Sequence, residues 1–338
     1  MTNVGWGNGV SEWTLHGGNL SHAMRAFPDA PGPWLDLSTG INPDPWPIPA
    51  DLAIDWHRLP DAAALTELER AAATCFGTDP ARVLALPGTE MGLRALATLG
   101  LPVPLRHVAP GYRTHAHALG DSTPIACADV GRDAARGGTI LLANPANPDG
   151  RLTKRADLMA LTETLAARAG WLVVDEAFVD AQDDASIVPL LGPDAPVIVM
   201  RSFGKFFGLA GVRLGFAVGP VALIARWRAM LGSWPLSAAA IAIGTAAYRD
   251  TVWIAATRLQ LVDRAAALDA MLARHGLAAT GASPLFRLID CDAAALFAHL
   301  ARQGILTRPF DYDPRWLRLG VPATAQDLNR LDRALANG

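Results

Sequence analysis

Residues 202–215 of the chain read SFGKFFGLAGVRLG and place Lys205 between a glycine and two phenylalanines. Arg213 follows Lys205 eight positions later. Lysine usually lies on a solvated, polar face of a protein, so this apolar and glycine-rich setting is unusual. A lysine that is partly desolvated, or near another cation, loses its proton more easily, and its free amine condenses with a carbonyl to form a Schiff base. The stretch therefore indicates a reactive lysine.

The composition indicates a globular protein with one large domain and a smaller one. The 338 residues are 51% hydrophobic and 18% charged, which favours a sizeable core over disorder. The net charge of −3 offers no basic footprint for nucleic acid. Cys75, Cys127 and Cys291 are widely separated, which fits a reducing compartment and argues against disulfides or a zinc site. Because we find neither a signal-peptide pattern nor an uninterrupted apolar span, we expect a cytoplasmic protein without a membrane segment.

Short apolar or β-branched runs alternate with helical patterns through the middle of the chain. The unit from Thr139 to Asp175 predicts a strand, a helix within residues 153–170 and a second strand, with Thr153 as the N-cap and Gly170 as the C-cap. Repetition of this unit predicts an α/β sheet covered by helices on both faces. The predicted strands are residues 83–86, 105–109, 123–127, 139–143, 171–175, 197–200 and 212–218.

The pattern changes after about residue 222, where long helices are followed by short strands near 285–290 and 316–321. This change predicts a smaller α+β domain. We expect an N-terminal arm over residues 1–35 that contributes to the small domain, a large domain over 36–222 and a small C-terminal domain over 223–338.

Polar residues follow three of the predicted strands. Asn147 lies in the turn 144-NPANPDG-150, Asp175 ends the strand 171–175, and Ser202 and Lys205 follow the strand 197–200. Ligands of open α/β sheets bind beyond the carboxyl ends of the strands, so we expect these side chains to converge on one small molecule. Each has a structural alternative when taken alone, such as a helix cap for Asp175 or a turn residue for Asn147.

The residue types define what that molecule must offer. Lys205 needs a carbonyl, Asp175 a basic nitrogen, Asn147 an oxygen, and Ser202 and Arg213 an anion. Pyridoxal 5′-phosphate supplies an aldehyde, a ring nitrogen, a phenolate oxygen and a phosphate.

A further anion cradle is predicted at 87-PGTEMGLRAL-96, where a strand ends in Gly88 and a helix begins with Thr89 and Glu90. Free backbone N–H groups at such a helix start suit a phosphate.

The chain resembles the aspartate-aminotransferase-type, or fold type I, pyridoxal-phosphate enzymes. Within them it most resembles the L-threonine O-phosphate decarboxylases of cobalamin biosynthesis, which are related to the histidinol-phosphate aminotransferases. The resemblance implies a mixed, mostly parallel seven-stranded sheet flanked by helices, a smaller α+β domain and a homodimer. The motifs that carry it are 16-HGGN-19, 36-DLSTGINP-43, 109-APGY-112, 144-NPANPDG-150, 175-DEAFVD-180, 201-RSFGKFFGLAGVRLG-215, 305-ILTRPF-310 and 317-LRLGV-321.

The resemblance also implies roles for individual residues. Lys205 is expected to bond the cofactor, Asp175 to hold its ring nitrogen protonated, Asn147 to donate to its phenolate oxygen and Tyr112 to stack on its ring. The expected cofactor contacts are Gly88, Thr89, Glu90, Tyr112, Asn147, Asp175, Ser202, Lys205 and Arg213. The expected substrate contacts are His16, Asn42 and Arg308 for a phosphate and Arg318 for a carboxylate.

Two positions distinguish branches of the family. Phe178 stands where aminotransferases usually place a tyrosine, which favours the decarboxylase branch. Leu59 in 59-LPD-61 replaces a tyrosine that relatives direct to the partner subunit's cofactor phosphate, and leucine cannot donate a hydrogen bond. No metal site is expected, because His115 and His117 at i, i+2 spacing lie on different faces of a helix.

The implied reaction is the decarboxylation of L-threonine O-3-phosphate to (R)-1-aminopropan-2-ol O-phosphate. Short motifs do not decide between decarboxylation and transamination, because the outcome depends on which Cα bond is held perpendicular to the cofactor ring. A histidinol-phosphate-type aminotransferase and a serine-phosphate decarboxylase stay open as enzyme alternatives. A cofactor-sensing regulator is the non-enzyme alternative.

Overall fold

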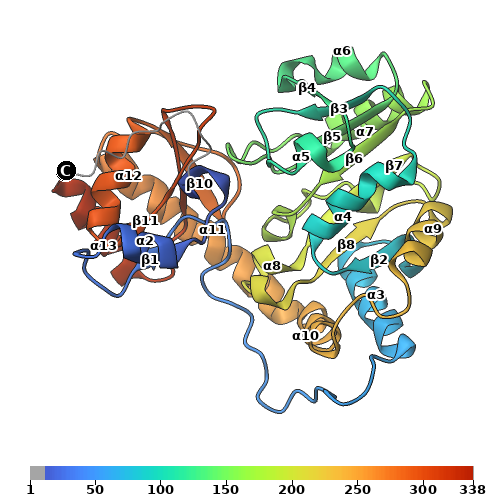
Figure 1. Ribbon diagram of the computed structural model, residues 1–338, viewed down its shortest axis with the longest axis horizontal. Helices are drawn as coiled ribbons and strands as arrows, with labels where there is room; N and C mark the ends of the chain where they lie inside the picture. Colours follow the sequence, from blue (N-terminus) through green and yellow to red (C-terminus); the bar gives the residue numbers. More distant parts are fainter. Residues whose placement is uncertain (1–11, 338) are drawn as a thin grey trace. The chain divides into compact units, whose positions relative to one another are not determined.

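Seven strands form the central sheet of the larger of two units in the computed structural model, which describes residues 12–337 (Figure 1). The strand order is β2-β8-β7-β6-β5-β3-β4, and only β8 runs antiparallel to its neighbours. The predicted mixed, mostly parallel seven-stranded sheet is confirmed. The strands are β2 (Val83–Leu86), β3 (Leu105–Val108), β4 (Thr123–Ile125), β5 (Thr139–Ala143), β6 (Trp171–Asp175), β7 (Val197–Ser202) and β8 (Gly215–Val218).

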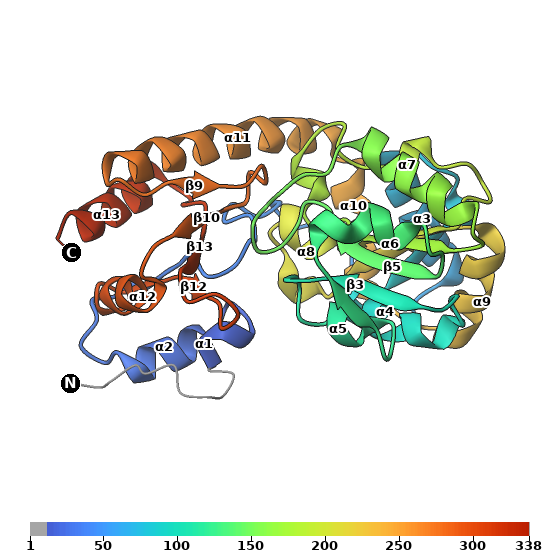
Figure 2. The ribbon, with the colours of Figure 1, turned by 90° about the horizontal axis from the view of Figure 1, so that it is seen from above.

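Helices cover both faces of this sheet (Figures 1 and 2). On one face, Leu93 of α4 and Trp227 of α9 join a buried cluster with alternate strand residues such as Val173 and Met200. On the other face, Phe76 of α3 and Tyr248 of α10 pack edge-on against Phe216 of β8. The helices of this unit are α3 (Ala62–Phe76), α4 (Thr89–Ala95), α5 (His115–Ala118), α6 (Val130–Ala134), α7 (Arg155–Ala166), α8 (Phe203–Phe206), α9 (Val221–Leu231) and α10 (Ala238–Arg249).

The predicted strand–helix–strand unit is present as β5, α7 and β6, but both predicted caps of α7 were wrong. The helix begins after Lys154, and the backbone of Thr153 instead pairs with the side-chain amide of Asn144. At the other end Ala167 is the C-cap and Ala169 takes the left-handed conformation. Gly170 lies beyond it, where a Cβ would lie 2.5 Å from the Gly138 carbonyl oxygen, so close packing explains this glycine.

The small unit contains a four-stranded antiparallel sheet of order β12-β13-β10-β9, with α11 and α12 on opposite sides (Figure 2). A parallel pair, β1 and β11, joins the segment after the N-terminal helices to the C-terminal part of the chain. The elements are α1 (Glu12–Leu15), α2 (Leu20–Ala26), β1 (Leu35–Asp36), the part of α11 (Thr251–Arg274) from Leu259 onward, β9 (Ala279–Thr280), β10 (Phe286–Asp290), α12 (Ala293–Arg302), β11 (Ile305–Leu306), β12 (Arg308–Pro309), β13 (Trp316–Gly320) and α13 (Ala325–Ala336).

Contacts between Cα positions assign Pro45–Asn147 and Leu152–Arg258 to the large unit. The small unit takes the described residues up to Asp44, Pro148–Arg151 and the chain from Leu259. Thus α9 and α10 go with the large unit, whereas the sequence analysis put a boundary after residue 222. The reason is packing, since α9 contacts β2 and α10 contacts α3. Residues 1–11 of the predicted arm lie outside the described residues. Within residues 12–337, no helix combines the length and hydropathy that a bilayer crossing requires.

A buried glutamate, Glu69, accepts a hydrogen bond from the strand at one side of the large sheet. Strand β2 lies at the edge, and the backbone N–H of Ala85 donates to Glu69 of α3 at 2.9 Å. Arg228 of α9 donates to the same carboxylate oxygen at 2.8 Å and to the Val83 carbonyl at 2.9 Å. Glu69 therefore ties an edge strand to two helices on opposite faces.

We expect Glu69→Ala to lower the free energy of unfolding by about 1–3 kcal/mol, because it leaves a buried backbone donor without its acceptor. The matched control is Glu163→Ala on the exposed part of α7, which should change it by less than about 0.5 kcal/mol. Urea unfolding of both variants measures the difference. Equal effects of the two substitutions would contradict this role of Glu69.

Candidate active site

The carboxyl ends of six strands, all except β8, lie along one edge of the large sheet. The register pairs Ala143 of β5 with Asp175 of β6, and Asp175 with Met200 of β7. Gly215 of β8 pairs with Ser202 of β7 on one side and with Leu86 of β2 on the other. The segments that follow β2, β3, β5, β6 and β7 therefore leave the sheet at the same edge. These segments and the last residues of β6 and β7 carry every candidate cofactor residue of the large unit except Arg213, which precedes β8.

Asp175 is held by a histidine that the sequence analysis did not assign to the site. Nε2 of His115 lies 2.9 Å from Oδ2 of Asp175, and the backbone N–H of Ala177 donates to Oδ1 at 3.1 Å. His115 is 1% exposed, so this contact is sheltered from water. Its position could have indicated a role in the site, because His115 follows Tyr112 by three residues beyond the end of β3. The sequence pattern alone suggests only a metal pair with His117.

Lys205 lies in α8, a single turn rich in aromatic residues. Its Nζ is 5.8 Å from the centroid of the Phe178 ring, within reach of a cation–π contact. The flanking Phe203 and Phe206 are fully buried, whereas Lys205 itself is half-buried. The aromatic neighbours thus shield one side of the amine, as its sequence setting predicts.

Two glycines bring the loop after β2 close to Arg213. A Cβ at Gly88, whose φ is +86°, would lie 2.8 Å from a terminal nitrogen of Arg213. A Cβ at Gly215 would lie 2.6 Å from the backbone nitrogen of Thr89. Gly88 and Thr89 start α4, and Arg213 is exposed and in the left-handed conformation. Backbone donors and a guanidinium therefore lie together without intervening side chains.

Glu90, the next residue, directs its carboxylate to an aromatic side chain. The Tyr112 hydroxyl donates to Glu90 Oε2 at 3.0 Å and the Thr114 hydroxyl donates to the same oxygen at 2.8 Å. Arg94 donates to the other oxygen at 2.6 Å. Burial alone would raise the pKa of Glu90, but these hydrogen bonds outweigh it and lower the pKa. Burial, and then the charge of Glu90, raises the pKa of Tyr112 to about 12.

Ser202 and Asn147 complete the candidate set of the large unit. Ser202 is the last residue of β7 and is 7% exposed, and Asn147 is 8% exposed. The turn that carries Asn147 is fixed by Asn144, whose side chain accepts from the Thr153 N–H at 2.8 Å.

In the small unit, two predicted arginines lie side by side. Arg308 of β12 pairs in register with Arg318 of β13, and their exposed fractions are 7% and 2%. Arg318 donates to the Ser38 carbonyl at 3.0 Å. Burial, and then the charge of Arg308, lowers the pKa of Arg318. A guanidinium keeps its proton in proteins, so these strands form a buried positive region suited to anionic groups.

The other two substrate candidates also belong to the small unit. His16 is exposed and follows Leu15, whose carbonyl accepts from Arg308 at 3.3 Å. Asn42 is 2% exposed and accepts from the Asp44 N–H at 3.0 Å. The glycines after His16 pack on the segment that leads to Asn42, since the Gly18 N–H donates to Ser38 Oγ at 2.7 Å.

The sequence pattern of the family described as aminotransferase class I and II matches residues 126–335. The chain belongs to the aminotransferase class I and II family. The resemblance inferred from the motifs is thereby confirmed.

Named relatives within this family cover almost the whole chain. A threonine-phosphate decarboxylase of a Sinorhizobium species is 40% identical over 95% of this chain and 97% of its own. The threonine-phosphate decarboxylase of Pseudomonas aeruginosa is also 40% identical, over 95% of this chain and 96% of its own. The histidinol-phosphate aminotransferase of Rhodospirillum centenum is 30% identical, over 85% and 87%.

Solved structures of this family share the fold. The histidinol-phosphate aminotransferase of Sinorhizobium meliloti, in complex with pyridoxal 5′-phosphate, superposes with a TM-score of 0.72 at 24% identity, over 83% of this chain and 82% of its own. The L-threonine-O-3-phosphate decarboxylase of Porphyromonas gingivalis gives 0.73 at 18% identity, over 90% and 98%. The fold type I architecture predicted from the sequence is confirmed.

The lowered pKa of Glu90 predicts a pH-dependent contribution to stability. An unfolded glutamate titrates near about pH 4.3. The folded pKa is lower, so the stabilisation is full above the unfolded pKa and disappears as the pH falls through the folded pKa. Glu90→Gln should therefore be less stable than the wild type at pH 7, with a difference that shrinks towards pH 4. Urea unfolding across this range measures it, and a difference that is constant with pH would contradict the assignment.

Proposed function

We propose that the protein is a pyridoxal-phosphate-dependent decarboxylase that converts L-threonine O-3-phosphate to (R)-1-aminopropan-2-ol O-phosphate in cobalamin biosynthesis. The observation that carries the proposal is the 40% identity, over 95% of the chain, to two relatives named threonine-phosphate decarboxylase. The named aminotransferase relative is 30% identical over a smaller share of the chain.

The residues of the large unit fit the proposed cofactor. Gly88, Thr89, Ser202 and Arg213 supply backbone donors, hydroxyls and a guanidinium for its phosphate, and the two missing Cβ atoms leave room for that group. Lys205, half-buried beside aromatic rings, is the amine for its aldehyde.

Three side chains serve the ring of the cofactor in this proposal. Asp175 keeps a proton on the ring nitrogen, because His115 and the Ala177 N–H hold its carboxylate in one orientation. Asn147 donates to the phenolate oxygen. Tyr112 stacks on the ring, with its hydroxyl fixed by Glu90. The side chain of Glu90 therefore serves Tyr112 rather than the phosphate, which a carboxylate would repel.

Bound pyridoxal phosphate supplies an electron sink for the pair of electrons released when a bond at the substrate Cα breaks. The chain decides which bond that is. In this proposal Arg318 would hold the substrate carboxylate and Arg308, with Asn42 and His16, its phosphate, and the bond from Cα to the carboxylate is the one that breaks. Carbon dioxide leaves, and Lys205 returns a proton to Cα. Phe178 carries no hydroxyl at a position beside Lys205, in keeping with the decarboxylase branch.

We also propose that the protein works as a cytoplasmic homodimer. Trp56 and Leu59 of the large unit are 72% and 66% exposed, and Trp234 is 58% exposed. Contiguous exposed apolar surface is typical of protein–protein contacts, and Leu59 belongs to such a surface beside α3 and α10. A hollow of about 580 Å³ is lined by the segment that contains Leu59 and by α3 and α10. Cys75, Cys127 and Cys291 form no disulfide, which fits a reducing compartment.

Decarboxylation and transamination are separated by one assay. Purified protein with pyridoxal phosphate and L-threonine O-phosphate should release carbon dioxide and form aminopropanol phosphate. Lys205→Ala should lower that rate by about 10²–10⁴-fold, since it removes the proton donor. Lys154→Ala is the matched control, because Lys154 is the only other lysine of the chain and is exposed.

Amino transfer to 2-oxoglutarate without release of carbon dioxide would show the aminotransferase alternative instead. Serine phosphate is assayed in parallel, since one methyl group in a pocket discriminates by only about 1–3 kcal/mol.

The cofactor cradle makes a second prediction. Gly215→Ala places a methyl group against the backbone of Thr89, which cannot move aside as a flexible side chain would. We expect it to weaken binding of pyridoxal phosphate by about tenfold or more, because a displaced backbone N–H loses a hydrogen bond to a charged phosphate, and such a bond contributes about 1.5–3 kcal/mol. Gly211→Ala is the control, since a Cβ there meets nothing within 4 Å. Absorbance titration measures the cofactor affinity of both variants. Equal affinities would contradict the phosphate-binding role of this loop.

A further inference from the structure

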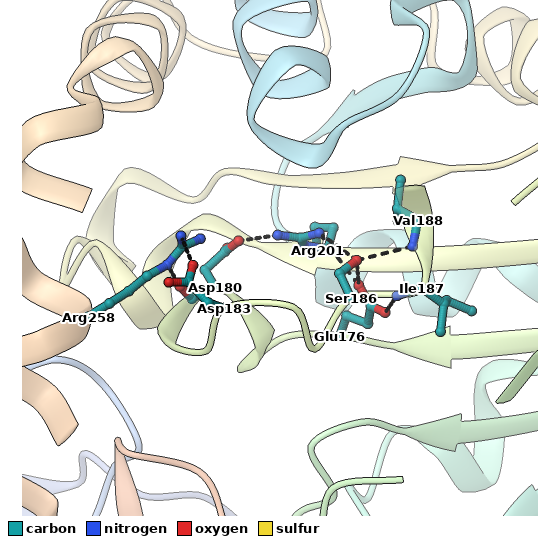
Figure 3. Close-up of polar contacts among 8 residues, drawn as sticks. All are labelled: Glu176, Asp180, Asp183, Ser186, Ile187, Val188, Arg201 and Arg258. Atoms are coloured by element: carbon teal, nitrogen blue, oxygen red, sulfur yellow. Dashed lines mark hydrogen bonds and ion pairs between the residues drawn. The ribbon is translucent and has the colours of Figure 1, made fainter. Parts of the chain in front are cut away.

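Three buried charged side chains and one half-buried hydroxyl form a polar cluster in the large unit (Figure 3). It consists of Glu176, Asp180, Ser186 and Arg201, and we call it the Arg201 cluster. Glu176 is 0% exposed, and Asp180 and Arg201 are each 3% exposed. None of the four is assigned a role by the proposed reaction.

Arg201 is the centre of the cluster and contacts its members from both ends of its guanidinium. Its Nη2 pairs with Asp180, while its Nη1 lies 3.2 Å from Ser186 Oγ and 3.5 Å from Glu176 Oε2. The guanidinium carbon lies 4.2 Å from the centroid of the Phe76 ring. Arg201 is therefore held in one orientation by ionic and aromatic contacts.

Glu176 connects the cluster to the loop before β7. Ser186 Oγ donates to its Oε2 at 2.6 Å, and the Ile187 N–H donates to its Oε1 at 2.9 Å. In Figure 3 the side chains of Ser186 and Arg201 both point to the carboxylate of Glu176. The carboxylate thus fixes the end of β6 and the approach to β7 at once.

The charges of the cluster are costly to bury. The carboxylates of Glu176 and Asp180 face the single guanidinium of Arg201. Burial is the largest effect on the pKa of Glu176 and raises it. Desolvation alone would lower the pKa of Arg201, but the charges of Asp180 and Glu176 outweigh it and raise the pKa. Buried ion pairs contribute little net stability compared with apolar side chains of similar size. Stability alone is therefore a poor reason for this cluster.

Its place in the sheet offers a better reason. Glu176 directly follows Asp175, and Arg201 directly precedes Ser202 and stands four residues before Lys205. Neighbouring residues of a strand point to opposite faces, so the cluster and the candidate cofactor residues lie on opposite faces of the same strand ends. The Glu176 N–H also donates to the Met200 carbonyl at 2.9 Å, next to Arg201.

We propose that Arg201 and Glu176 are positioning residues, which hold the ends of β6 and β7 in the alignment that lets Asp175, Ser202 and Lys205 act on one cofactor. The inference rests on the proposed pyridoxal-phosphate site. It assigns a purpose to the Glu of 175-DEAFVD-180 and the Arg of 201-RSFGKFF-207.

The test compares two buried arginines of the same sheet. Arg201→Lys keeps the charge but loses the planar fork that reaches partners on both sides. Arg106→Lys makes the same change at an arginine of β3 that is 4% exposed and pairs with Asp133 at 3.3 Å, away from the strand ends that carry the site. Thermal unfolding, the dissociation constant for pyridoxal phosphate and the pH titration of the bound cofactor's absorbance are measured for each.

We expect both variants to unfold at lower temperature than the wild type. Only Arg201→Lys should weaken cofactor binding, by about tenfold or more, and shift the pH titration of the absorbance, because the loss of one hydrogen bond to a charged cofactor group costs about that much affinity. Wild-type affinity and titration in Arg201→Lys, or an equal change in Arg106→Lys, would overturn the inference.

If Arg201→Lys does not fold, Ser186→Ala tests the positioning role instead. This substitution keeps the three charges of the Arg201 cluster and removes only its hydroxyl. Weakened cofactor binding in Ser186→Ala supports the inference, and unchanged binding overturns it. A wild-type protein that binds no pyridoxal phosphate is a different outcome, which refutes the proposed function itself.

Discussion

The alignment of strand ends in the large sheet is the constraint on which the site depends. Register pairs Asp175 with Ala143 on one side and with Met200 on the other, and Ser202 with Gly215. Each loop that leaves this edge carries a different chemical group. A shift of β6 or β7 by one residue would turn these side chains to the other face, because successive residues alternate. The chemistry of the site is therefore inseparable from the packing of the sheet.

Both faces of the strand ends contain buried polar groups. On the cofactor face, His115 fixes the Asp175 carboxylate at 2.9 Å, and Glu90 fixes the Tyr112 hydroxyl at 3.0 Å. On the opposite face, the Arg201 cluster joins β6 to β7. The contacts of His115 and Glu90 thus orient Asp175 and Tyr112, and fixed orientation is what a preorganised site requires.

Much of this arrangement could be predicted from sequence, because it depends on local patterns. Apolar or β-branched runs of four to seven residues predicted all seven strands, and the strand ends singled out Asp175, Asn147 and Lys205 as candidate site residues. The side-chain partners could not be predicted in the same way. His115 and Asp175 are sixty residues apart, and their contact arises only when β3 and β6 lie in one sheet. The caps of α7 failed because tertiary contacts of Asn144 and Gly138 decided them.

The central claim is that Lys205 bonds covalently to pyridoxal phosphate at this edge of the sheet. The chain has only two lysines, Lys154 and Lys205, so reduction with borohydride followed by peptide mapping gives a direct answer. We expect one phosphopyridoxyl group per chain, on the peptide that contains Lys205, and none on the peptide that contains Lys154. A wild-type protein that is unlabelled at Lys205 after reconstitution with the cofactor would contradict it.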